Sequence, residues 1–135
     1  FFYQGDSVNY AEEFENYLDT YREMLGFVPP RVQARFNKLG EENPELLLAQ
    51  EKVRALVLDT PTLEEKTKQL ILFAVLAAQF RDAVVTHGLA ARRAGASWEE
   101  LQATLDLVYL FGGVSVANHA PKILADIKAK EEQSS

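Results

Sequence analysis

The sequence predicts an all-α fold, a single-domain bundle of about six or seven helices. Apolar residues recur every three or four positions along most of the chain, which is the spacing of one helix face. Glycine and proline residues divide these stretches into segments of helical length, and there is almost no strand pattern. A chain of 135 residues also suits one domain with a single hydrophobic core.

Three helices are predicted before residue 60. The first covers residues 14–25, where apolar side chains at helical spacing alternate with acidic ones, and it ends at Gly26. The second covers residues 30–40 and starts at a proline pair. The third opens at Pro44, because the first helical turn tolerates proline, and it runs to Val57. Each of these segments has one apolar face to bury.

A break at residues 59–61 separates this first half from the next predicted helix, residues 63–78. Thr62, with Glu65 three positions later, has the pattern of a capping box that satisfies free backbone N–H groups at a helix start. After Leu70 the helix is apolar on nearly every side, which a surface helix would not be. We therefore expect it to be central in the bundle.

The following two helices have clear stop signals. One covers residues 80–94 and ends at Gly95. Ser97 and Glu100 form a second capping-box pattern, and the helix that they open ends at residues 112–113, a glycine pair.

A last helix is predicted to carry the apolar positions of residues 116–127. Pro121 either kinks this helix or marks its first turn, and the sequence leaves both readings open. The predicted domain covers residues 8–130. Residues 1–7 are expected to be a tag remnant or a disordered lead, and residues 131–135 a frayed polar tail.

Composition excludes several classes of function. The chain has no cysteine, which removes thiol nucleophiles, dithiol redox chemistry and cysteine-based metal sites. The net charge of −6 and the lack of a dense basic stripe argue against nucleic-acid binding. The longest apolar run, residues 70–78, is far shorter than the roughly 20 residues that a membrane span needs. We expect an acidic, soluble, cytoplasmic protein.

Three sequence segments together resemble a known family. Residues 63–71 (LEEKTKQLI) are similar to the pattern L-x-x-K-T-R-E-L-I. His87 and the residues up to Leu101 are similar to H-x-x-x-A-x-x-A-G-(A/V)-(T/S)-x-E-E-(I/L), and residues 112–120 (GGVSVANHA) to G-G-x-P-A-A-x-N-A. Their order and spacing resemble the carboxymuconolactone decarboxylase and AhpD-like family over about half of the chain. The resemblance implies an all-helical fold and a homo-oligomer, either a trimer or a hexamer.

The chain departs from the peroxidase branch of that family at its reactive residues. Counted back from His87, the two cysteine positions of that branch fall on Phe80 and Ala83, and counted from Gln69 they fall one residue later. The family's proton-relay glutamate corresponds to Gln69, whose amide does not transfer a proton at neutral pH. A cysteine-dependent peroxidase activity is therefore excluded, and the decarboxylase branch or a divergent relative remains.

Three residues are the candidates for catalysis. His87 falls on the family's functional histidine, and its side-chain type suits proton transfer near neutral pH, although a solitary imidazole on a helix face is also a common structural residue. Arg81 suits the orientation of a substrate carboxylate, or is simply a solvated charge. His119 suits anion binding near a helix start, or is a polar residue at an element boundary. Two histidines without accompanying carboxylates do not predict a metal site, and no cofactor motif is present.

The sequence thus leaves two hypotheses. In the first, the protein is a cofactor-independent decarboxylase or related lyase that acts on a small, carboxylated, lactone-type substrate, as the resemblance implies, with His87 moving the proton. In the second, it is a catalytically inactive, oligomeric helical module that binds a small ligand or a partner protein. Gln69 and the missing cysteines favour the second hypothesis, and the matched position of His87 favours the first.

Overall fold

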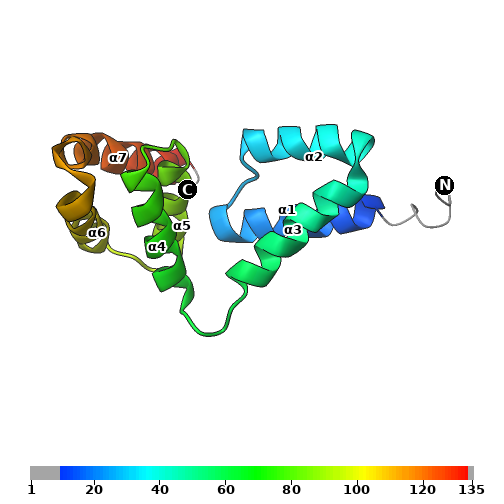
Figure 1. Cartoon of the computed structure of the whole chain (residues 1–135), viewed down its shortest axis with the longest axis horizontal. Helices are drawn as coiled ribbons and strands as arrows, with labels where there is room; N and C mark the ends of the chain where they lie inside the picture. The colour runs from blue at the N-terminus through cyan, green and yellow to red at the C-terminus, as the bar shows by residue number, and fades with distance from the viewer. Residues whose placement is uncertain (1–9, 134–135) are drawn as a thin grey trace. The chain divides into compact units, whose positions relative to one another are not determined.

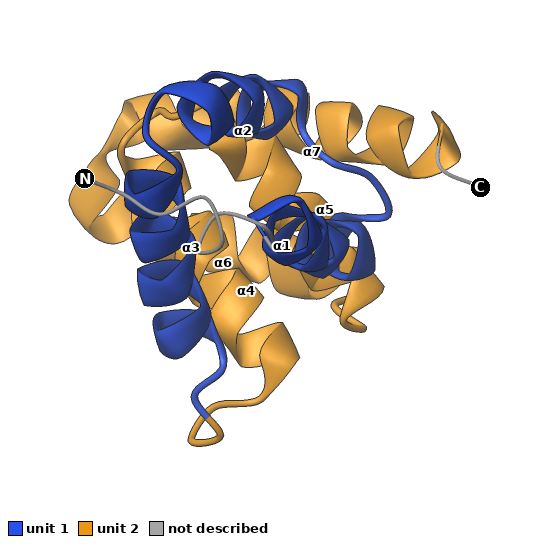
Figure 2. Ribbon diagram, turned by 90° about the vertical axis from the view of Figure 1, so that its right-hand side faces the viewer, with its two compact units in different colours: residues 1–60 blue, residues 61–135 orange. Residues whose placement is uncertain are grey.

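A computed structural model describes residues 10–133 and confirms the all-α prediction, since these residues form seven helices and no strand. The chain divides into two compact units, residues 1–60 and residues 61–135 (Figure 2). The predicted lead, residues 1–7, and residues 134–135 of the predicted tail lie outside the described part. The helices are α1 (Tyr10–Leu25), α2 (Pro30–Glu42), α3 (Pro44–Leu58), α4 (Glu65–Ala78), α5 (Ala83–Arg93), α6 (Trp98–Gly112) and α7 (Val114–Gln133).

Unit 1 contains α1, α2 and α3, with boundaries close to those that the sequence predicts. Proline occupies the first turn of α2 and of α3, and the side chain of Asn43 accepts a hydrogen bond from the backbone N–H of Leu46 at 3.2 Å. Gly26, which follows α1, has φ 88°, a left-handed conformation that glycine adopts without a steric penalty. The core of this unit consists of Leu18, Tyr21, Phe36 and Leu47.

A buried carboxylate connects the three helices of unit 1. Glu51 on α3 is 1% exposed, and its Oε2 accepts hydrogen bonds from the hydroxyl of Tyr21 at 2.9 Å and from Arg35 at 2.5 Å. Arg54 lies 3.6 Å from the other oxygen, Oε1, and its guanidinium stacks on the ring of Tyr21. Burial raises the pKa of Tyr21 to about 12, so its hydroxyl remains a donor at neutral pH. The cluster compensates the charge of Glu51.

We expect Arg35→Met to lower the free energy of unfolding by about 3 kcal/mol, because it removes a cation from a carboxylate that stays buried. Replacing both partners, Arg35→Met with Glu51→Leu, should recover part of this loss, since the buried carboxylate is gone, although Arg54 and the hydroxyl of Tyr21 lose Glu51 as a partner. Urea denaturation followed by circular dichroism measures both values. Lys38→Met, which breaks an ion pair between exposed side chains, is the matched control and should change stability by less than about 1 kcal/mol. A double variant as unstable as the single one would contradict this account.

Unit 2 contains the remaining four helices. Helices α4 and α5 lie side by side, α6 packs against α4, and α7 packs against α5 and α6 (Figure 1). Its core combines large side chains from all four helices with several alanines. The fully buried members are Phe73 of α4, Ala91 of α5, Leu101 of α6 and Ile127 of α7. This arrangement places α5 between α4 and α7.

Gly88 permits the close packing of α5. A Cβ atom at this position would collide with the side chain of Ile127 on α7 and would lie 3.0 Å from Cε1 of Phe73 on α4. Any larger residue would therefore push α5 away from one of its neighbours. Since His87 precedes Gly88 directly, the same contact sets the distance of the histidine from α4.

The helix boundaries of unit 2 differ from the prediction at three places. Helix α4 begins at Glu65 with Glu64 as its N-cap, so Thr62 does not cap it. Helix α5 begins at Ala83, three residues later than predicted. Helix α7 already begins at Val114, which places Pro121 inside the helix rather than in its first turn. The capping box of Ser97 and Glu100 is confirmed, with both reciprocal hydrogen bonds present.

The structure differs in part from the expected enclosure of α4 and from the expected frayed tail. Helix α4 buries Gln69, Phe73 and Ala77, but Ile71 and Val75 on its other face are nearly half exposed, so the helix is not enclosed on every side within this chain. Helix α7 continues to Gln133, three residues into the segment that we expected to fray. The predicted domain boundaries at residues 8 and 130 remain predictions.

Candidate functional site

The turn between α4 and α5 shapes the first part of the site. Phe80 has φ 56°, a left-handed conformation that is strained for a bulky side chain. The backbone N–H groups of Phe80 and Arg81 donate hydrogen bonds to Ala77 and Leu76, which closes the end of α4. The chain then reverses direction, and Arg81 and Asp82 lead directly into α5.

His87 lies on the side of α5 that faces α4. Its Nδ1 is 2.8 Å from Oε1 of Gln69, and the Nε2 of Gln69 donates a hydrogen bond to Oε2 of Glu65 at 2.9 Å. Gln69 is fully buried, His87 is half-buried and Glu65 is exposed. A row of polar groups thus leads from the surface of α4 to the imidazole.

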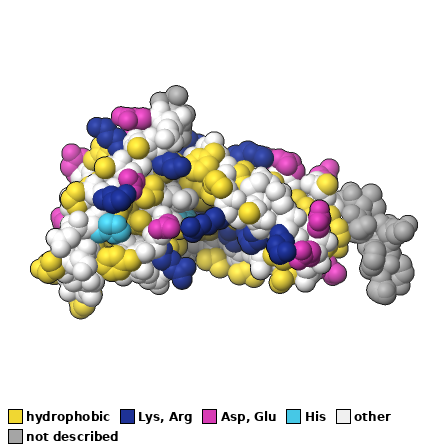
Figure 3. All heavy atoms as spheres, turned by 90° about the horizontal axis from the view of Figure 1, so that it is seen from above, with side chains coloured by type: hydrophobic (Ala, Val, Ile, Leu, Met, Phe, Trp, Pro, Cys, Tyr) yellow, Lys and Arg dark blue, Asp and Glu magenta, His cyan; other side chains and the backbone are white. Residues whose placement is uncertain are grey.

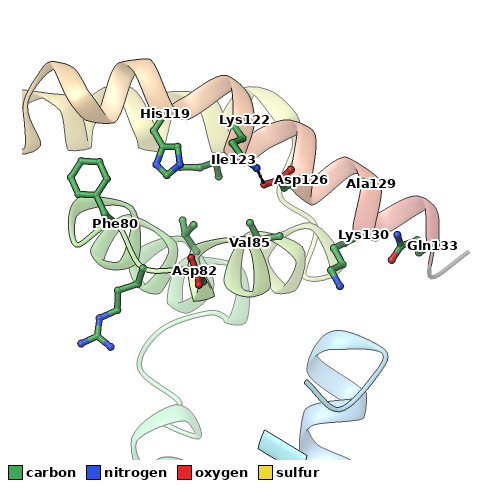
Figure 4. Close-up of a pocket in the computed structure, with 12 residues that line it drawn as sticks. Phe80, Asp82, Val85, His119, Lys122, Ile123, Asp126, Ala129, Lys130 and Gln133 are labelled. Carbon is green, nitrogen blue, oxygen red and sulfur yellow. Dashed lines mark hydrogen bonds and ion pairs between the residues drawn. The ribbon is translucent and has the colours of Figure 1, made fainter. Parts of the chain in front are cut away.

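A cavity of about 420 Å³ lies between the first turn of α5 and α7 (Figure 4). The apolar part of its wall comes from Phe80, Val84, Val85, Ile123 and Ala129. The polar and charged lining residues are Arg81, Asp82, His119, Lys122, Asp126, Lys130 and Gln133. The cavity therefore combines apolar surface with charged groups at its edge.

Three cations and two carboxylates line this cavity. Lys122 and Asp126 form an ion pair at 2.7 Å, one helical turn apart on α7. The remaining lining charges are the basic Arg81 and Lys130 and the acidic Asp82, which leaves a positive balance. A small anion with an apolar body would match both the charge and the wall of this cavity.

His119 projects from α7 into the same cavity and lies against Phe80. The two rings are stacked, with their centroids 5.9 Å apart and an angle of 17° between their planes. His119 is the sixth residue of α7 and hence lies beyond the first turn, where the helix N-terminus would favour an anion. Any anion binding by His119 would consequently depend on its own ring and on the neighbouring cations.

The structure brings two of the three candidate residues together. Arg81 and His119 both line the cavity between α5 and α7. His87 is not among the lining residues, because it points toward α4. The three residues therefore do not form one cluster within this chain.

Sequence reasoning missed several residues of the site. It treated Gln69 as a lost catalytic group, whereas the structure shows it bound to His87. It also missed Lys122 and Lys130, although polar residues at positions 119, 122, 126, 130 and 133 follow helical spacing along one edge of α7. That spacing was the signal that could have found them.

The surface, the described side chains and the helices add three observations. The face seen in Figure 3 mixes basic, acidic and hydrophobic side chains. Within residues 10–133, no three His, Asp or Glu side chains are grouped as a metal ion would require. None of the helices in that range has the length and apolar character needed to cross a membrane.

Comparison with known proteins gave one match. The sequence model described as "Carboxymuconolactone decarboxylase family" matches residues 44–126, which extend from the start of α3 into α7. This match begins before the three motifs and covers all the residues that line the α5 side of the cavity. The comparisons with curated proteins and with solved structures gave no match.

The left-handed conformation of Phe80 leads to a stability prediction. Phe80→Ala and Phe80→Gly both remove the ring, but only glycine adopts φ 56° without a steric penalty. We expect the glycine variant to be more stable than the alanine variant by about 1 kcal/mol. Thermal denaturation of the two variants measures the difference. Equal stabilities would show that the backbone of residue 80 relaxes when the ring is absent.

Proposed function

Because the chain belongs to the carboxymuconolactone decarboxylase family, we propose that it is a cofactor-independent lyase that decarboxylates a small, carboxylated, lactone-type substrate. The observation that supports this proposal is the position of His87. It is a half-buried imidazole at the family's functional position, and one of its ring nitrogens is held by a buried side chain. This combination fixes the orientation of a side chain of the type that transfers protons near neutral pH.

In the proposed step, one proton replaces the carboxylate that leaves as carbon dioxide. The bond between the substrate carbon and its carboxylate breaks, carbon dioxide leaves, and the electron pair remains on the carbon next to the conjugated lactone. The imidazolium of His87 gives its proton to that carbon, and the neutral ring then takes a proton from water. The reaction has no net oxidation or reduction, in keeping with a chain that has no cysteine.

The position of Arg81 and His119 supports a second candidate function. Both line the cavity on the α7 side of α5, away from His87, together with apolar residues and additional cations. This arrangement suits the binding of a small carboxylate with an apolar body, without chemistry at His87. In this second proposal the protein is an inactive helical module that binds such a ligand.

One experiment with carboxymuconolactone separates the two candidates. If the protein is a lyase, carbon dioxide release should be measurable, and His87→Ala should lower kcat by about 100-fold or more, because it removes the group that transfers the proton. Asn118→Ala, an exposed residue next to His119, is the matched control and should leave kcat unchanged. Circular dichroism would establish that each variant keeps its helical content.

The binding module gives a different result in the same series. Calorimetry would then detect binding without turnover, Arg81→Gln would weaken the binding, and His87→Ala would leave it unchanged. If turnover survives in His87→Ala but is lost in His119→Ala, the lyase proposal stands only with its reaction centre moved into the cavity.

We also propose that the protein assembles as a homo-oligomer, a trimer or a hexamer as the family resemblance implies. Large apolar side chains are exposed where α6 ends and α7 begins, and Phe111 is 100% exposed. Leu107, Leu110 and Val114 at the same corner are each more than 60% exposed. Exposed apolar groups gathered in one place commonly mark a protein contact.

Substitution of Phe111 tests this assembly. We expect Phe111→Ser to lower the mass observed by sedimentation equilibrium to that of a smaller species, because it removes apolar area from the proposed contact. Leu46→Ser, which changes an exposed apolar residue of α3, is the matched control and should keep the original mass. A monomeric unmodified protein would contradict the proposal outright.

A further inference from the structure

The hydrogen bonds around Gln69 determine which end of its amide faces His87. Glu65 lies one helical turn before Gln69 on α4, and its Oε2 is 2.9 Å from Nε2 of Gln69. An ionised carboxylate only accepts hydrogen bonds, so the amide nitrogen must point toward Glu65. The amide oxygen Oε1 then faces Nδ1 of His87 at 2.8 Å.

This orientation in turn determines where the ring proton of His87 lies. An amide oxygen only accepts, and so Nδ1 of His87 must donate and carry a hydrogen. In the neutral ring the other nitrogen, Nε2, then carries the lone pair. We infer that Glu65 and Gln69 hold His87 in its Nδ1–H tautomer, so that the imidazole exchanges its proton with a substrate through Nε2.

The burial of Gln69 makes the arrangement specific. Its side chain is 0% exposed, so a reversed amide would place two oxygens, one from Gln69 and one from Glu65, against each other. This contact between the two oxygens is repulsive, and an unpaired polar group is costly in a buried site. Lys68 lies 3.9 Å from Oε1 of Glu65, whereas Gln69 binds Oε2, so the two contacts use different oxygens.

The same hydrogen bond suits both charge states of the ring. In neutral His87 and in its imidazolium form alike, Nδ1 carries a hydrogen that Oε1 of Gln69 accepts. The contact with Gln69 therefore persists while a proton enters or leaves at Nε2, and the ring needs no reorientation. Glu65 and Gln69 act through His87 and are positioning residues. Their catalytic consequence rests on the proposed role of His87, but the tautomer itself does not.

Nitrogen-15 NMR of the histidine rings in the full-length protein tests the tautomer directly. At a pH where His87 is neutral, we expect Nδ1 to show the shift of a protonated nitrogen and Nε2 that of an unprotonated one. His87→Gln, which removes one of only two histidine signals, assigns the resonances. A dominant Nε2–H tautomer in the unmodified protein would overturn the inference.

Glu65→Gln is the decisive variant, because it nearly preserves shape at an exposed position while adding a donor. The amide of Gln69 then has two permitted orientations, and we expect the Nδ1–H population of His87 to fall. Gln69→Leu removes the acceptor and should produce a loss at least as large. Glu64→Gln is the matched control, since this neighbouring exposed carboxylate makes no cap hydrogen bond, and it should leave the spectrum unchanged. An unchanged tautomer in Glu65→Gln would contradict the inference.

The kinetic arm separates this inference from the lyase proposal. If both hold, Glu65→Gln should lower kcat about tenfold or more with little change in KM, because fewer molecules present the correct nitrogen. If the NMR results hold but His87→Ala keeps full turnover, the tautomer inference stands and the lyase assignment to His87 fails. If NMR shows the other tautomer while His87→Ala loses turnover, the tautomer inference fails and the lyase assignment to His87 stands.

Discussion

The close packing of α5 at Gly88 is the constraint on which the rest of unit 2 depends. A side chain there would collide with Ile127 of α7 and crowd Phe73 of α4, so only glycine lets one helix contact both neighbours at this level. The residue before it, His87, is consequently held against α4 within hydrogen-bonding distance of Gln69. The residues one turn earlier, Val84 and Val85, form the wall of the cavity toward α7.

This packing gives α5 two chemically different sides. Toward α4 there is a single imidazole, anchored at one nitrogen by a neutral amide in the interior. Toward α7 there is an open cavity with apolar walls, a second imidazole and an excess of cations. The first side holds one group in a fixed orientation, and the second is the side on which we propose that a charged ligand binds.

The sequence predicted the elements better than it predicted the site, for physical reasons. Helix ends depend on local signals, and so Gly26, Gly95 and the capping box of Ser97 were read correctly. The start of α4 was misplaced because Thr62 has the cap residue type but the backbone becomes helical only after Glu64. The separation of His87 from His119 could not be predicted, since it depends on how α5 and α7 pack. The role of Gln69 was hidden because a motif comparison records the lost glutamate, not the hydrogen bond that replaces it.

The chain itself shows why an amide suits position 69. Where this protein buries a carboxylate, at Glu51, it surrounds the group with Arg35, Arg54 and the hydroxyl of Tyr21. Gln69 is equally buried, and its side chain is hydrogen-bonded to a half-buried imidazole and to the carboxylate of Glu65. A glutamate there would place a buried carboxylate beside the exposed carboxylate of Glu65, where like charges repel, and it would draw a proton onto His87 or onto itself. The neutral amide avoids that charge and still fixes the ring, which leaves His87 able to alternate between its two protonation states.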